Sequence, residues 1–226
     1  MPTLTAERTG YAVRLDSVTK TYGNVTALSE VSHDFRRGGF TAIMGPSGSG
    51  KSTFLHCASG LDQPSGGTVR IGDVDLGRLS EAKRTRLRRE RIGFVFQSFN
   101  LIPSMDVEQN IVLPLQLSGT APDPGWLAEV VGRVGLRDRL AHRPSELSGG
   151  QQQRAAVARA LITRPDVVFA DEPTGALDPR TARDVLRLLR EAVDQTGQTV
   201  VLVTHDPMAA AWADSVVFLS GGRIVD

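Results

Sequence analysis

Short, nearly continuous apolar runs alternate along this chain with longer stretches in which apolar residues recur at helical spacing. The clearest runs are Phe40–Met44, Ile92–Phe96, Val167–Ala170 and Val200–Val203. Parallel strands buried on both faces have this composition, because helices cover both sides of their sheet. The segment 181–194 instead gathers its apolar residues on one side, as an amphipathic helix does. The alternation predicts an α/β fold built on a parallel sheet.

The two ends of the chain carry other patterns. Tyr11–Val18 alternates apolar and polar residues, as a half-exposed strand does. Ser215–Leu219 and Arg223–Val225 flank two glycines, and this spacing predicts a β-hairpin. Residues 1–10 lack the apolar stretch of a secretory signal. We expect them to be a flexible N-terminus in front of a single domain over residues 11–226.

The region 98–165 differs from its surroundings. Its apolar residues recur at helical spacing, as in Trp126–Val131, and no strand-like run interrupts it. Prolines punctuate it, among them Pro103, Pro114, Pro122, Pro124 and Pro144. We therefore predict an inserted helical subdomain here.

Composition narrows the function classes. The 226 residues carry a formal net charge of +1, which gives no global field to attract nucleic acid. The single Cys57 cannot form an internal disulfide and is typical of a small buried side chain in a reducing cytoplasm. No apolar run approaches the ~20 residues of a membrane helix. One basic cluster lacks interleaved aromatic residues, so we interpret it as a solvated helix face; it comprises Arg84, Arg86, Arg88, Arg89 and Arg91.

A glycine-rich loop lies between a predicted strand and a predicted helix. It consists of Gly45, Pro46, Ser47, Gly48, Ser49, Gly50, Lys51, Ser52 and Thr53. This spacing in this context is the phosphate-binding loop of nucleoside triphosphatases, in which backbone amides and a helix N-terminus surround the phosphates. We expect Lys51 to reach the β- and γ-phosphates and Ser52 to ligate Mg²⁺.

Polar residues follow the other apolar runs. Asp171 and Glu172 end one strand, and His205 and Gln97 follow two others. Open α/β sheets bind ligands at the carboxyl ends of their strands, and two adjacent acids point in different directions. Each residue also has a non-catalytic interpretation: the two acids as solvated carboxylates that open a loop, His205 as a structural histidine, and Gln97 as an exposed glutamine.

A second candidate anion site follows further along. The pentapeptide comprises Leu147, Ser148, Gly149, Gly150 and Gln151, and Ser148 can cap a helix running to Leu161. A capped helix N-terminus with glycines and a hydroxyl suits an anion. One chain cannot easily turn both anion sites onto the same γ-phosphate, whereas two chains related by a twofold axis can.

The pentapeptide and the phosphate loop together resemble the ATP-binding subunit of an ABC transporter. The resemblance implies a P-loop (RecA-like) core with an N-terminal antiparallel β region and an inserted helical signature subdomain. It also implies roles for single residues. These are Mg²⁺ contacts for Gln97 and Asp171, water activation by Glu172, a γ-phosphate contact for His205, adenine stacking on Tyr22, and signalling across a dimer by Asp178.

Within the family, Arg91–Gln97, Phe99–Leu101 and Asp171–Gly175 look most like the branch for lipoprotein release, macrolide export and antimicrobial-peptide export. That branch implies a separate permease with few membrane spans and a large extracytoplasmic domain. Two positions depart from its pattern: Gly39 stands where glutamate is common, and Ala176 where asparagine is frequent. Neither removes a catalytic group.

We therefore expect an ATPase motor that closes as a head-to-tail homodimer on ATP and Mg²⁺, at the cytoplasmic face of the membrane. The alternative is an ABC ATPase that acts on DNA or ribosomes, or that regulates a membrane-bound cell-wall process. The DNA class carries coiled-coil or zinc-bearing insertions, and the ribosome class usually carries two ATPase units. Neither feature is visible in this sequence.

Overall fold

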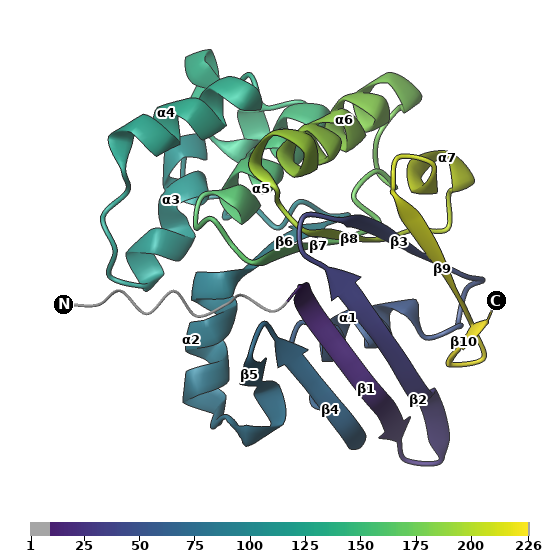
Figure 1. Ribbon diagram of the computed structural model, residues 1–226. Helices are drawn as coiled ribbons and strands as arrows, with labels where there is room; N and C mark the ends of the chain where they lie inside the picture. Colours follow the sequence, from purple (N-terminus) through teal and green to yellow (C-terminus); the bar gives the residue numbers. More distant parts are fainter. Residues whose placement is uncertain (1–9, 226) are drawn as a thin grey trace.

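A six-stranded sheet forms the centre of the computed structural model, which describes residues 10–225 (Figure 1). The strand order is β10-β9-β3-β8-β7-β6, and all neighbours are parallel except β9 and β10. The strands are β3 (Phe40–Met44), β6 (Ile92–Phe96), β7 (Val167–Asp171), β8 (Val200–Val203), β9 (Ser215–Ser220) and β10 (Arg223–Val225). The predicted parallel sheet and C-terminal hairpin are confirmed. The predicted flexible segment 1–10 lies, apart from Gly10, outside the described residues.

Alternating side chains on these strands enter two separate cores. On β7, Val167 and Phe169 face one core, while Val168 and Ala170 face the other. All four are fully buried. This double burial explains why the strands read as continuous apolar runs rather than as an alternation.

An antiparallel sheet in the order β2-β1-β4-β5 lies beside the central one. Its strands are β1 (Tyr11–Tyr22), β2 (Val25–Arg36), β4 (Gly66–Ile71) and β5 (Val74–Asp75). Helix α1 (Lys51–Ala58) lies between the two sheets (Figure 1), and its Phe54, Leu55 and Cys57 are fully buried there. The buried Cys57 and the N-terminal antiparallel β region are thus confirmed.

Helices cover the opposite face of the central sheet. Helices α5 (Gly149–Leu161) and α6 (Pro179–Thr196) pack against it, and Figure 1 shows α3 (Val107–Leu117) and α4 (Pro124–Arg133) on their outer side. The remaining α-helices of residues 10–225 are α2 (Glu81–Arg91) and α7 (Pro207–Ala210), with 3-10 turns at Leu76–Arg78, Arg137–Arg139 and Pro144–Glu146. Region 98–165 thus holds α3, α4 and α5; its status as a subdomain stays a prediction. Within residues 10–225, no helix combines the length and apolarity needed to span a bilayer.

The arginine cluster on α2 corrects the interpretation of a solvated helix face. Only Arg86 is exposed; Arg84 is buried and pairs with Glu81 at 2.8 Å, and Arg91 pairs with Asp166. Helix α2 packs against β6 and α3, so the aliphatic stems lie along protein surface while the guanidinium groups reach acceptors. Charge alone could not reveal these partners.

Candidate functional site

Four neighbouring parallel strands end at the same edge of the central sheet. The phosphate loop follows β3, His205 follows β8 after one residue, Glu172 follows β7 and Gln97 follows β6. Because β3, β8, β7 and β6 are consecutive in the sheet, these groups lie in a row. The structure therefore brings together the polar residues that the sequence placed after separate apolar runs.

Two adjoining hollows lie along this edge. The larger, of about 740 Å³, contains Lys51, Asp171, Glu172 and His205 together with parts of β2 and the C-terminal hairpin. The smaller, of about 280 Å³, contains Gln97 and shares Ser52, Asp171 and Glu172 with the larger one. Sequence reasoning missed the lining residues Val25, Thr26, Ala27, Gly221 and Gly222. They approach the site only through the packing of distant strands, which leaves no local signal.

The phosphate loop is shaped to hold an anion close to its backbone. Gly50 has φ 100°, and a Cβ there would lie 2.5 Å from the carbonyl oxygen of Ala27. Only glycine fits this conformation and this approach. Helix α1 begins directly afterwards, so its free amides and dipole face the loop. The Lys51 ammonium donates to the carbonyl oxygens of Gly45 and Pro46 at 2.8 and 2.9 Å, which holds it across the loop.

Glu172 and His205 form a direct contact between adjacent strand ends. The Glu172 Oε1 lies 2.7 Å from His205 Nδ1, and the Thr204 hydroxyl donates to Glu172 Oε2 at 3.5 Å. The Glu172 amide donates to the carbonyl of Val203 at 2.9 Å, although its φ of 45° is unusual for a residue other than glycine. Such strained conformations persist where the surrounding structure over-determines them, typically at functional sites.

Asp171 has the features of a cation ligand. Its Oδ1 is buried and has no hydrogen-bond partner within residues 10–225. Burial raises the pKa of this carboxyl above its usual value; His56 opposes that shift, and the Glu172 carboxylate adds to it. No group of three or more His, Cys, Asp or Glu side chains among the described residues could hold a metal by itself. Mg²⁺ commonly takes one or two carboxylates together with water and substrate phosphates, so Asp171, Ser52 and Gln97 fit it.

The pentapeptide at residues 147–151 lies outside both hollows. Ser148 caps α5 as predicted: its Oγ accepts from the Gln151 amide at 3.3 Å, and Gln151 Oε1 accepts from the Ser148 amide at 2.9 Å. Asp178 caps the neighbouring α6 and accepts from the Thr181 hydroxyl at 2.5 Å. Leu147 is buried, whereas Ser148 is exposed at the helix start. The structure does not bring this second anion site onto the chain's own phosphate loop.

Tyr22 lies at the end of β1 and also does not line the larger hollow. The residue is 49% exposed. Its hydroxyl donates to Asp62 at 2.6 Å, and the Lys20 ammonium lies 4.8 Å from the ring centroid. One edge of the ring is therefore fixed, and its role toward adenine stays a prediction.

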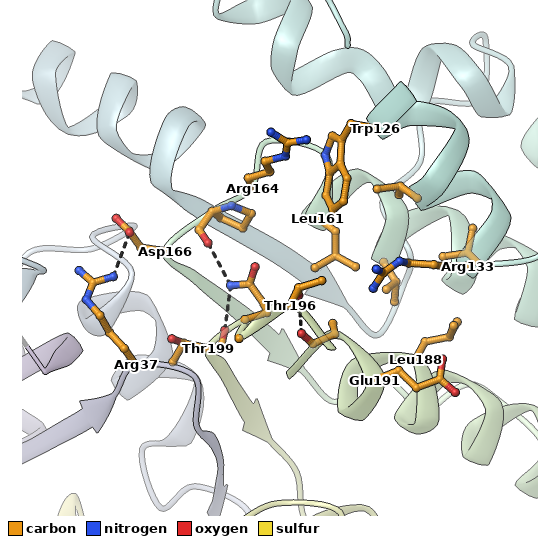
Figure 2. A pocket seen from close by; sticks show the side chains of 17 residues that line it. Arg37, Trp126, Arg133, Leu161, Arg164, Asp166, Leu188, Glu191, Thr196 and Thr199 are labelled. Carbon is orange, nitrogen blue, oxygen red and sulfur yellow. Dashed lines mark hydrogen bonds and ion pairs between the residues drawn. The ribbon is translucent and has the colours of Figure 1, made fainter. Parts of the chain in front are cut away.

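A separate cavity of about 430 Å³ lies between α4, the end of α6 and the loop before β7 (Figure 2). None of the predicted site residues lines it. Its polar groups are satisfied locally: Asp166 pairs with Arg37 at 3.1 Å, and Trp126 Nε1 donates to the carbonyl of Ile162 at 2.9 Å.

Comparison with known proteins decides the family. The family model described as "ABC transporter" matches residues 28–175, which include the phosphate loop, the pentapeptide and the acidic pair. The chain belongs to the ABC transporter family. It holds the part of such a transporter that binds and hydrolyses ATP. The pentapeptide at residues 147–151 is hereafter called the signature.

Individual relatives cover nearly the whole chain. The lipoprotein-releasing system ATP-binding protein LolD 1 of Rhodospirillum rubrum is 41% identical over 95% of this chain and 97% of its own length. The macrolide export ATP-binding/permease protein MacB of Marinobacter nauticus is 41% identical over 95% of this chain, which spans only 34% of that relative. The ATP-binding cassette MJ0796 of Methanocaldococcus jannaschii, solved as a dimer in a post-hydrolysis state with ADP and Pi, superimposes with a TM-score of 0.86 at 40% identity, over 95% of this chain and 97% of that one.

Proposed function

We propose that this chain is the motor subunit of a membrane export or extraction machine. It binds ATP at the sheet edge, closes head-to-tail on a second copy and drives a separate permease at the cytoplasmic face of the membrane. The observation that carries the proposal is that the two parts of the expected ATP site lie apart from each other within one chain. The hydrolysis groups Glu172 and His205 line the hollow with the phosphate loop, while the signature lies outside it.

Substrate binding follows from the geometry of the larger hollow. The amides at the start of α1 and the Lys51 ammonium surround the phosphates, whose oxygens replace the loop carbonyls as acceptors for Nζ. Tyr22 offers its exposed face to adenine, and stacking of this kind gives affinity with modest base selectivity. Ser52, Gln97 and Asp171 would hold Mg²⁺, which neutralises charge that develops on the phosphates.

Hydrolysis needs a water molecule positioned in line with the γ-phosphate. Glu172 lines both hollows, so its carboxylate can accept a proton from a water molecule held there. His205 holds the Glu172 carboxylate in place through the 2.7 Å contact and itself lines the larger hollow. Positioning and charge stabilisation account for most of phosphoryl-transfer catalysis, and these residues supply both.

A second copy of the chain completes each site. The capped N-terminus of α5 presents Ser148 and two glycines outward, which suits the γ-phosphate of a nucleotide held by another chain. An isologous arrangement then forms two equivalent sites. Loss of the γ-phosphate removes the shared anion and weakens the dimer. The dimeric MJ0796 cassette supports this arrangement by similarity.

The permease would dock in a groove beside α2 and α3. This groove, of about 370 Å³, has an apolar lining that includes Phe94 and the exposed Leu61 and Leu117. Arg88, Arg89 and Arg159 also line it. We propose that the occupant is a cytoplasmic helix of the permease with an apolar face and acidic flanks, because it complements both the apolar and the basic part of this lining. The groove reaches Asn100, in the segment that follows Gln97, so docking can bias the hydrolysis site.

Co-purification tests the partner. A tagged Glu172→Gln chain, recovered from gently solubilised native membranes, should bring down a permease with few spans and a large extracytoplasmic domain, identified by mass. Leu117→Glu in the same background places a charge in the groove and should abolish recovery without changing ATP binding. Recovery of DNA, ribosomes or a cell-wall enzyme in place of a permease would favour the non-transport alternative.

A further inference from the structure

Gln153 in α5 is a fully buried polar residue to which the proposed chemistry assigns no role. Its Nε2 donates to the carbonyl oxygen of Pro173 at 2.6 Å and to that of Phe96 at 3.2 Å. Both partners can only accept, so the contacts determine which end of the amide faces them. The other end, Oε1, has no hydrogen-bond partner among the described residues.

The two carbonyl groups belong to the segments that carry the hydrolysis residues. Phe96 immediately precedes Gln97, and Pro173 immediately follows Glu172. One side chain therefore holds the backbone beside both. The helix that carries this side chain begins at the signature, with Ser148 as its cap five residues earlier, about 7.5 Å along the axis.

Packing alone does not explain a glutamine at this position. A buried oxygen without a donor destabilises a fold, and a leucine of similar volume would remove that oxygen. On the same face of α5, one turn along, Ala156 and Val157 are apolar and fully buried. We therefore look for the role of this glutamine in the two carbonyl groups that its amide binds, those of Phe96 and Pro173.

We propose that Gln153 is a positioning residue that keeps the chain's own Gln97 and Glu172 segments in register with the signature helix offered to the partner's ATP. The inference rests on the proposed two-chain site. A shift of either segment on hydrolysis pulls on α5 through these two hydrogen bonds. The state of one ATP site thereby reaches the other site of the dimer.

Steady-state kinetics with a matched control tests the first half of the proposal. Gln198 is also buried, and its Nε2 donates to the carbonyls of Pro165 at 3.0 Å and Thr199 at 3.2 Å beside the separate cavity of Figure 2. Gln153→Leu and Gln198→Leu remove equivalent pairs of hydrogen bonds. We expect Gln153→Leu to lower kcat about tenfold or more with little change in ATP affinity, as a small misplacement of catalytic groups does. Equal kinetic losses in both variants would overturn the proposal.

Mixed dimers test the second half. A small amount of wild-type chain is mixed with a large excess of Glu172→Gln chain, and the first round of hydrolysis is measured, which takes place at wild-type sites beside an inactive partner's signature. Adding Gln153→Leu to the excess chain should slow this first hydrolysis by about the factor by which Gln153→Leu alone lowers kcat. Unchanged turnover would show that Gln153 does not act on the signature. If the Glu172→Gln chain forms no dimer at all, the two-chain site fails, and the comparison with Gln198→Leu still decides the first half.

The pH profile of Gln153→Glu provides a readout that a purely structural role would not give. A carboxyl group at this buried position has one O–H donor for the two carbonyls, and only when it is protonated; burial raises its pKa. Its kcat relative to wild type should therefore fall as pH rises from about 6 to about 9. A constant ratio across that range would contradict the proposal, including in the event that Gln153→Leu does not fold.

Discussion

Asp171→Asn should stabilise the nucleotide-free chain while it removes Mg²⁺-dependent turnover. The wild-type carboxylate is partly buried with an unpartnered Oδ1, and burial raises its pKa. A raised carboxyl pKa means that the folded state binds the proton more tightly than the unfolded state. The ionised group therefore destabilises the fold at neutral pH. The neutral amide of asparagine has nearly the same shape and lacks this cost.

An unsatisfied buried polar group costs about 1–3 kcal/mol and a charged one more, so replacing the carboxylate by a neutral amide removes only the excess, on the order of 1 kcal/mol. In a domain of this size each kcal/mol shifts Tm by about 2–4 °C. Thermal unfolding at pH 7 without nucleotide should therefore give the Asp171→Asn variant a Tm higher by a few degrees. The difference should shrink as the pH falls through the pKa of Asp171, because the wild-type carboxyl then becomes neutral.

In the presence of Mg²⁺ and ATP, the wild type should have the higher Tm of the two proteins. A ligand present at a hundredfold over its Kd stabilises the native state by about 2.7 kcal/mol, and the wild type gains more because its carboxylate contacts the cation. Asp166→Asn is the matched control at the other end of β7. It breaks ion pairs with Arg37 and Arg91, so it should lower Tm and leave the response to Mg²⁺ and ATP intact. An Asp171→Asn variant that is less stable without ligand, or that gains as much from it, would refute the reasoning.

Three further outcomes are expected. Gly150→Ala should lose about 1–3 kcal/mol of unfolding free energy, because the added Cβ would overlap Thr181. Gly149→Ala is the control: its Cβ would make only ordinary contacts, so this variant should keep the wild-type stability. Urea denaturation measures both. Burial raises the pKa of the Cys57 thiol from 9.0 to about 11, so unfolding free energy should fall between those pH values, and Cys57→Ala should lack that slope. His205→Ala should lower kcat at least about a hundredfold with a smaller change in KM, which a coupled phosphate-release assay measures.

Local sequence pattern predicted the elements that are buried on both faces. The run Phe40–Met44 coincides with β3, and Ile92–Phe96 coincides with β6. Strand β2 (Val25–Arg36) was not predicted, because it is half polar and its pairing with β1 contains register shifts that break the two-residue period. Glu30 within it even adopts a positive φ of 52°.

The candidate site could be predicted only as far as strand ends reveal it. Glu172 and His205 were placed because each follows a buried run, and parallel strands end at one edge. Ala27 approaches Gly50 through the packing of a separate sheet, which no local pattern shows. Gln153 carried a weak signal, because it is a polar residue on the apolar side of a predicted helix, but its two carbonyl partners are visible only in the fold.

The size of the Glu172→Gln chain in solution tests the central claim most directly. Light scattering after gel filtration should show a monomer without nucleotide and a dimer with ATP, because binding is intact and turnover is lost. Adding Ser148→Arg should return the chain to a monomer that still binds ATP, since the bulky side chain blocks the helix N-terminus offered to the partner. A Glu172→Gln chain that stays monomeric with ATP, or a dimer that survives Ser148→Arg, would contradict the shared site.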